Sequence, residues 1–179
     1  MDIVAHGLWT ASAVVLARRF TPISPRAAQA TVAAAVVPDL VHGLPLLAWA
    51  VIEGHAALPL LHAYAVAQPG REPWLPTEVA WASHHLHCAA HSAVIALVAT
   101  LWCLWTLRRM PILLLGWWLH IVIDVFTHSA DFYAAPVLYP LSDWAFDGVA
   151  WNAPAFLALN YLALAAAGWV LWRRRSNTG

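Results

Sequence analysis

Lysine is absent from this chain, and charged residues of any kind are scarce. Charged residues make up 10% of the 179 positions, against about 25% in soluble domains, whereas hydrophobic residues make up 62%. The formal net charge is zero, so no basic surface for nucleic acid is indicated and we expect no nucleic-acid partner. The scarcity of charge predicts an integral membrane protein whose main surroundings are membrane lipid.

Cysteine is also scarce. Cys88 and Cys103 lie in apolar sequence and form no C-x-x-C pair, which excludes a disulfide framework and favours buried free thiols. The twelve tryptophans are typical of the aromatic belts at the two surfaces of a bilayer. The length suits one membrane-embedded domain, residues 1–179.

Five apolar segments predict an all-α integral membrane bundle of about five transmembrane helices. They are Ile3–Ala17, the segment that starts at Ala27, Glu78–Leu107, the segment that starts at Pro111, and Ala155–Trp172. The first lacks a basic n-region and an A-x-A-like cleavage site, so we expect a retained helix and not a signal peptide. Leu44–Ala67 is apolar but contains two prolines, and it is compatible with a span, a re-entrant hairpin or an interfacial helix.

The arginines predict the orientation. In a five-span arrangement eight of them fall on one side: Arg18, Arg19, Arg26, Arg108, Arg109 and Arg173 to Arg175. Only Arg71 falls on the other side, so the positive-inside rule predicts a multi-pass protein with its N-terminus outside and its C-terminus in the cytoplasm. A sixth span at Leu44–Ala67 would remove this bias, so we expect that segment not to cross.

The helix that follows Gly116 has a polar edge. His120, Asp124 and His128 recur every four residues in otherwise apolar sequence, and side chains four apart share one helix face. Burying such groups in hydrocarbon without partners costs several kcal/mol. The compensation is either a bound metal ion or hydrogen bonds between core histidines. An imidazole and carboxylate set suits zinc, manganese or iron.

Further histidines and acids occur elsewhere in the chain. Pro38-Asp39 interrupts a helix, His42 follows one turn later, and broken backbone at membrane depth is tolerated where it lines a cavity. His84, His87 and His91 share a face, and two histidines one turn apart can hold one ion. A polar, solvated helix start would also explain them, and of these histidines we favour His87 and His91 as ligands. The arginine bias places most of these groups toward the outer face. Ligand roles stay open for the remaining candidates, His84, His85, His128, Asp143 and Asp147.

Short elements in order along nearly the whole chain carry a family resemblance. They are Ala5-His6-Gly7, Pro38-Asp39-Leu40-Val41-His42, Ala90-His91-Ser92, and His120-x-x-x-Asp124-x-x-Thr127. This pattern resembles the LexA-regulated, membrane-bound, metal-dependent hydrolase family of bacterial inner membranes. The chain departs from it at Val41, where the family has a second aspartate, and at Leu86, where the family has a histidine.

The resemblance implies a metal-dependent hydrolase of the bacterial inner membrane. Together with the spacings it predicts one or two divalent ions, most simply zinc, held by His6, Asp39, His87, His91, His120 and Asp124. Asp39 or His42 is the expected general base. A site near the outer membrane face favours an amphiphilic substrate, such as a lipid or lipid-linked phosphoester. No pattern predicts the oligomeric state.

Two other functions fit parts of this pattern. Paired histidines on helices can ligate haem, although the interleaved carboxylates weigh against a haem-binding protein. Intramembrane histidine and aspartate are also typical of a metal-ion or proton transporter. A transporter should distribute these groups across the bilayer depth, and here they gather on one side.

Overall fold

The computed structural model describes residues 1–176, and over these residues the chain is all-helical with no β-strand. This confirms the predicted all-α class. The helices are α1 (Ile3–Ala17), α2 (Pro25–Ala34), α3 (Val37–Val41), α4 (Leu44–Ile52), α5 (Ala57–Ala65), α6 (Thr77–Ala90), α7 (Ala93–Leu107), α8 (Leu113–Thr127) and α9 (Pro154–Ser176).

The helices that could cross a membrane are fewer than predicted. Within residues 1–176, α9 alone is long and apolar enough by itself, over Pro154–Arg174. Two bent pairs, α2–α3 with α4 and α6 with α7, raise the number to three if each pair is one span. α1 and α8 have 15 residues each, or about 22 Å at ~1.5 Å per residue, against an apolar layer of about 30 Å. Membrane association is therefore supported, and the expectation of five spans is not confirmed.

A first break in the helices lies at Ala35, between α2 and α3. Pro38 stands in the first turn of α3, where its missing N–H costs nothing, and Asp39 follows it. The helix is thus interrupted as predicted, but the break lies at Ala35-Val36, before Pro38-Asp39, and Asp39 is inside α3. The break frees the Ala35 carbonyl, which accepts a hydrogen bond from His120 Nδ1 at 2.8 Å.

A second break, between α6 and α7, was not predicted. The sequence favours one helix over Glu78–Leu107, but the chain bends by 60° at His91 and Ser92. Ser92 caps α7 by accepting the Ile95 N–H at 3.1 Å, and its hydroxyl donates to the Tyr139 carbonyl at 2.5 Å. A helix that continued through Ser92 would lose this cap.

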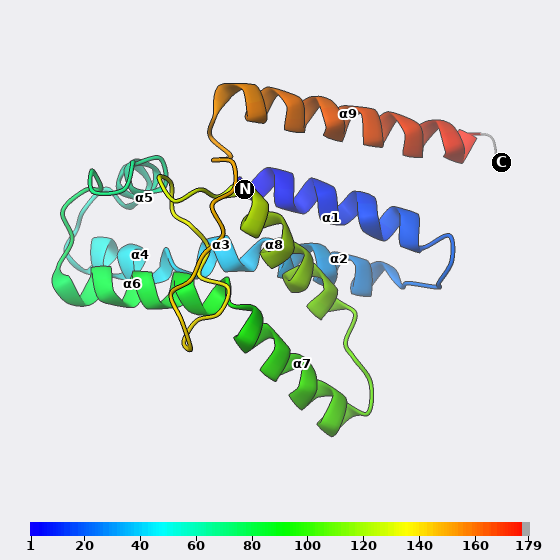
Figure 1. Ribbon diagram of the computed structural model, residues 1–179, viewed down its shortest axis with the longest axis horizontal. Helices are drawn as coiled ribbons and strands as arrows, with labels where there is room; N and C mark the ends of the chain where they lie inside the picture. Colours follow the sequence, from blue (N-terminus) through cyan, green and yellow to red (C-terminus); the bar gives the residue numbers. More distant parts are fainter. Residues whose placement is uncertain (177–179) are drawn as a thin grey trace.

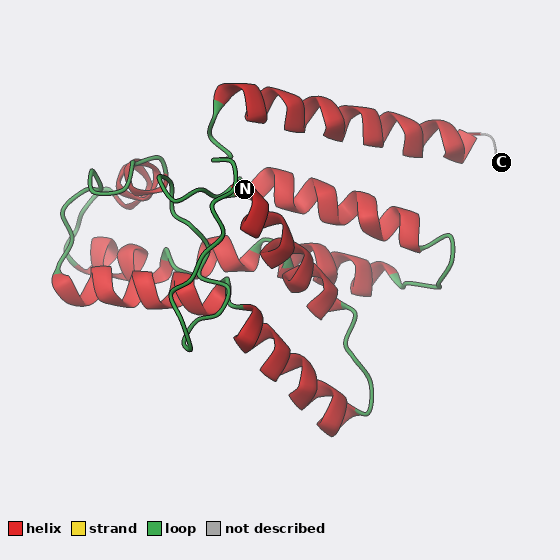
Figure 2. Cartoon of the chain, in the orientation of Figure 1, coloured by secondary structure: helices red, strands yellow, loops and turns green. Residues whose placement is uncertain are grey.

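The molecule has two ends. Figure 1 shows α4, α5 and α6 gathered at one end, and α1, α2, α7, α8 and α9 extending toward the other. α4 and α5 have nine residues each, about 14 Å, so neither crosses a bilayer alone. The N-terminus lies where the two groups meet, and the long loop between α8 and α9 runs there as well (Figures 1 and 2).

The arginines lie mostly at the end away from α5. There α1, α7 and α9 finish and α2 and α8 begin (Figure 1), and Arg18-Arg19, Arg108-Arg109 and Arg173-Arg174 stand at these helix ends. The helix ends therefore show the same uneven distribution of arginines from which the membrane orientation was predicted. The orientation itself stays a prediction.

Gly116 lets α8 approach α2 closely. A Cβ atom built on Gly116 would lie 1.9 Å from the Thr31 carbonyl oxygen and 3.2 Å from the Ala35 amide nitrogen. His120 lies one turn along the same face of α8, where it bonds the Ala35 carbonyl. The contact at Gly116 therefore sets the distance at which α8 presents His120 and Asp124.

Gly116→Ala is expected to force α8 away from α2 and to destabilise the protein by about 1–3 kcal/mol, because overpacked interiors cost that much. The metal affinity of the site described below should fall with it. Thermal unfolding in detergent and bound-metal analysis measure the two effects. Gly168→Ala on α9 is the matched control, since its new Cβ meets nothing within 4 Å. An unperturbed Gly116→Ala protein would show that the two backbones are not in contact.

Candidate metal centre

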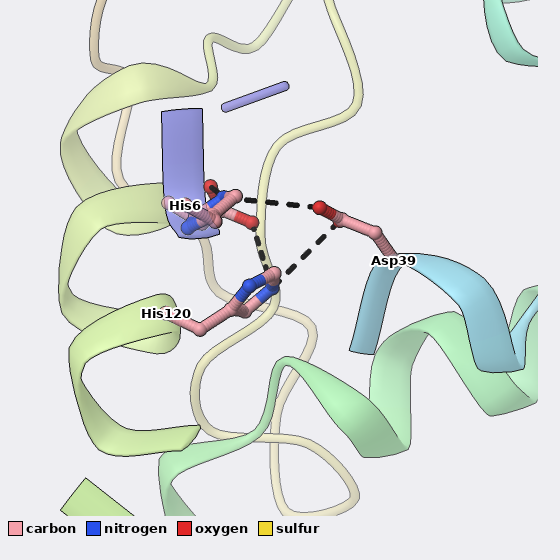
Figure 3. Close-up of side chains that lie close together, drawn as sticks. His6, Asp39 and His120 are labelled. Atoms are coloured by element: carbon pink, nitrogen blue, oxygen red, sulfur yellow. Dashed lines mark hydrogen bonds and ion pairs between the residues drawn. The ribbon is translucent and has the colours of Figure 1, made fainter. Parts of the chain in front are cut away.

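Four of the six predicted ligands meet at one point. His6 comes from α1, Asp39 from α3, and His120 and Asp124 from α8; one ligand atom of each lies within 4.8 Å of the others. Figure 3 shows His6 and His120 turned toward the Asp39 carboxylate. His6, His120 and Asp124 are fully buried, and Asp39 is partly exposed. This cluster could hold a metal ion, as the sequence predicted.

His91 adds a fifth group. It stands at the end of α6, and the bend there places its Nε2 3.0 Å from His120 Nε2. The same atom lies 3.2 Å from Asp124 Oδ2 and 3.6 Å from Asp39 Oδ1. The second break thus positions a predicted ligand, with the His91 side chain fully buried.

Three imidazole rings share a fixed tautomer. In each, Nδ1 lies at hydrogen-bond distance from a main-chain carbonyl oxygen: His120 from Ala35 (2.8 Å), His91 from His87 (2.8 Å) and His128 from Tyr133 (2.6 Å). A carbonyl oxygen only accepts, so Nδ1 carries the proton and Nε2 of the neutral ring keeps its lone pair. A partner on the far nitrogen is the usual way in which proteins orient a histidine toward a metal.

The contact between His91 and His120 needs a cation. Two Nε2 lone pairs 3.0 Å apart repel each other unless a proton or a metal ion lies between them. Nitrogens that share one tetrahedral zinc ion, at about 2.0–2.1 Å each, lie roughly 3.3 Å apart. Both nitrogens also face Asp124 Oδ2, a buried oxygen with no hydrogen-bond partner. Imidazole lone pairs converging on a buried carboxylate are a donor set suited to a divalent cation.

The two carboxylates lie between two groups of histidines. Asp124 Oδ1 is 2.8 Å from His6 Nε2, while its Oδ2 faces His91 and His120 at 3.2 and 3.1 Å. Asp39 Oδ2 is 3.9 Å from His6 Nε2, and its Oδ1 faces His91 and His120 at 3.6 and 3.8 Å. Each aspartate therefore directs one oxygen to His6 and the other to the His91–His120 pair.

His128 belongs to the His6 side. Its Nε2 lies 3.6 Å from Asp124 Oδ1 and 3.0 Å from the amino group of Met1, which itself contacts Asp124 Oδ1. Burial lowers the pKa of His128 to about 4, so the ring is neutral at physiological pH. The sequence left a ligand role for His128 open. Its four-residue spacing from Asp124 already pointed to this contact.

Two predicted site residues lie beside this cluster. His42 and His87 are not in the four-residue group; their rings pack edge to face with centroids 5.3 Å apart. His87 supports His91 through its main-chain carbonyl, and its own Nε2 has no hydrogen-bond partner among the described residues. Both side chains line a neighbouring cavity of about 490 Å³, together with Asp39 and His128.

The remaining candidates lie elsewhere. His85 faces the Tyr139 hydroxyl at 2.9 Å, and His84 lies 3.6 Å from Cys88 Sγ. Asp147 accepts the Ala130 N–H at 2.8 Å, which is a loop-capping role, and Asp143 is exposed. None of them enters the clustered group.

No family model, no curated protein and no solved structure matches this chain. Function is therefore inferred from the residues of the site and their geometry.

Proposed function

We propose that this chain is a membrane-bound, metal-dependent hydrolase with two divalent ions bridged by Asp39 and Asp124. The observation that carries the proposal is the arrangement of these carboxylates, each with one oxygen toward His6 and one toward His91 and His120. A carboxylate that faces two sets of imidazole nitrogens is suited to bridge two ions. The resemblance to the LexA-regulated hydrolase family supports the same activity.

The residues divide between the two positions. His6 and His128 would hold one ion beside Asp124 Oδ1, and His91 and His120 would hold the other beside Asp124 Oδ2. Zinc suits these nitrogen and oxygen donors best. Divalent ions held by these residues would lower the pKa of water toward about 7 and would stabilise the attacking and leaving oxygens of a displacement.

His42 is the proposed general base. The sequence favoured Asp39 or His42 as the general base. Asp39 would be a metal ligand in this arrangement, which leaves His42 for that role. It lines the cavity beside Asp39, and its buried Nδ1 has no hydrogen-bond partner among the described residues. A proton leaving water at the cavity side of the ions would be accepted by this ring.

The membrane supplies the proposed substrate. α9 is long and apolar enough to span a bilayer, and α1 and α9 begin near the end of α8 that carries Asp124 (Figure 1). With the arginines at the opposite end, the site would lie toward the outer face of the inner membrane. A lipid or lipid-linked phosphoester reaches such a position with its apolar part in the bilayer.

His42→Gln is expected to lower kcat by about 10²–10⁴-fold, the usual contribution of a general base, without loss of bound metal. Hydrolysis of bis(p-nitrophenyl) phosphate by protein in detergent gives the rate, and elemental analysis gives the metal content. His62→Gln on α5, an exposed histidine, is the matched control and should change neither. Loss of metal in His42→Gln would instead make His42 a ligand.

A zinc-flux assay and an absorption spectrum distinguish the hydrolase from a metal-ion transporter and from a haem protein. A metal-ion transporter would move zinc into liposomes with a rate that is lost in His120→Ala, and it would leave the phosphodiester intact. A haem protein would show a Soret band after purification. We expect hydrolysis without ion flux and no visible absorption band.

A further inference from the structure

Carboxylates and aromatic side chains line the cavity beside the metal centre. Away from the ions it is lined by two further carboxylates, Asp2 and Glu72, and by aromatic side chains, Tyr64, Phe132, Tyr133 and Trp151. No arginine is among its lining residues. Its volume of about 490 Å³ is that of a small-molecule site, for which roughly 300–1,000 Å³ is usual.

Glu72 accepts a hydrogen bond from a distant loop. The Tyr133 hydroxyl donates to Glu72 Oε1 at 2.8 Å across 61 positions of sequence. Burial, and then this bond to Glu72, raises the pKa of Tyr133, so the phenol keeps its proton and remains the donor. The ion pairs found within residues 1–176 include none that neutralises Glu72.

Asp2 adds a second negative charge. Its Oδ1 accepts the Ala5 N–H and the Tyr161 hydroxyl, both at 2.9 Å, while its buried Oδ2 has no partner among the described residues. Divalent ions would neutralise Asp39 and Asp124, but Asp2 and Glu72 are not among the clustered ligands. The Met1 amino group also lines the cavity, but it contacts Asp124. Asp2 and Glu72 therefore remain to attract a cationic ligand, and aromatic faces attract ammonium groups in particular.

We propose that this cavity binds the ammonium-bearing head group of a zwitterionic amphiphile, with Glu72 as its counter-ion. The proposal rests on the proposed hydrolase function and names its substrate class: a phosphoester of a cationic amino alcohol, choline-like or ethanolamine-like, on an apolar anchor. The phosphoester faces Asp39 and His128, and the ammonium group lies among the aromatic side chains. A purely anionic head group would meet the carboxylates of Asp2 and Glu72, and no arginine lines the cavity to pair with it.

Substrate competition tests the proposal. Dihexanoyl phosphatidylcholine and dihexanoyl phosphatidylglycerol are compared in one detergent at saturating zinc, and the choline lipid should have a kcat/KM at least about tenfold higher, or ~1.4 kcal/mol. Glu72→Gln should bring this ratio near one, mainly through KM, and Glu72→Asp should restore part of it. Glu78→Gln, an exposed acid on α6 outside the cavity, is the matched control. Equal rates in the wild type, or an unchanged ratio in Glu72→Gln, would overturn the proposal.

A binding assay separates this proposal from the hydrolase function. Choline and its neutral isostere 3,3-dimethylbutan-1-ol are titrated into wild-type protein while tryptophan emission is followed, since Trp151 lines the cavity. Choline should bind at least about tenfold more tightly, with the difference lost in Glu72→Gln. Selective choline binding without hydrolysis of either lipid would contradict only the hydrolase function. Equal binding of both probes would contradict only the ammonium site.

Discussion

Asp124→Asn is expected to slow hydrolysis by at least about a thousandfold, because divalent ions contribute several kcal/mol to the transition state and each 1.36 kcal/mol is tenfold in rate. Asp124 contacts four histidines of the site: His6 and His128 through Oδ1, and His91 and His120 through Oδ2. An amide offers one neutral oxygen in place of two anionic ones and cannot bridge two cations. The rate is measured with bis(p-nitrophenyl) phosphate at saturating zinc.

Asp143→Asn is the matched control for this substitution. Asp143 is exposed and lies outside the cluster, so the same chemical change should leave the rate within a factor of two of wild type. A wild-type rate in Asp124→Asn would mean that this carboxylate is structural and that any hydrolysis occurs elsewhere.

Removal of metal is expected to lower the thermal midpoint by roughly 10 °C. Four of the site residues, His6, His91, His120 and Asp124, are fully buried, so their charges and lone pairs have no water to replace a lost cation. An ion at about a thousand times its Kd adds ~4 kcal/mol of stability, and each kcal/mol moves the midpoint of a chain of this size by about 2–4 °C. Unfolding is followed in detergent after a chelator and again after zinc is added back.

Asp124→Asn, which lacks the bridging carboxylate, is compared with the wild type in the same thermal unfolding measurement. The midpoint of Asp124→Asn should not respond to chelator or zinc, whereas that of Asp143→Asn should respond as the wild type does. A wild-type midpoint that ignores both reagents would mean that protons, and not metal ions, neutralise the buried cluster.

The local patterns in the sequence predicted the core of the site. Four-residue spacing placed His120 and Asp124 on one helix face, and Pro38 indicated a break close to Asp39, which the structure has at Ala35-Val36. Both features depend on helix geometry within a few residues, which is why the sequence alone reveals them.

The roles of His87 and His91 depended on a break that the sequence does not mark. An unbroken helix would keep His84, His87 and His91 on one face. The capping serine at position 92 ends α6 at His91, so that His91 enters the cluster and His87 lines the cavity. Serine is common within helices as well as at their ends, and only the bonds that Ser92 makes with Ile95 and Tyr139 decide between these roles.

The distant contacts could not be predicted. Tyr133 and Glu72 are 61 positions apart in two loops, and nothing in either loop signals their hydrogen bond. The five-span expectation counted apolar segments, whereas the fold bends two helix pairs and ends α1 and α8 at 15 residues. Apolar composition indicates burial in a bilayer or in a core, but it does not fix where a helix ends.

Counting metal ions in purified protein tests the central claim most directly. The wild type, Asp124→Asn and Asp143→Asn are purified in zinc-containing buffer, freed of loose metal on a desalting column and measured by elemental analysis beside the protein concentration. The two-ion site predicts about two divalent ions per chain in the wild type and in Asp143→Asn, and fewer than one in Asp124→Asn. A wild-type protein that holds no stoichiometric metal, or an Asp124→Asn protein that keeps both ions, would contradict it.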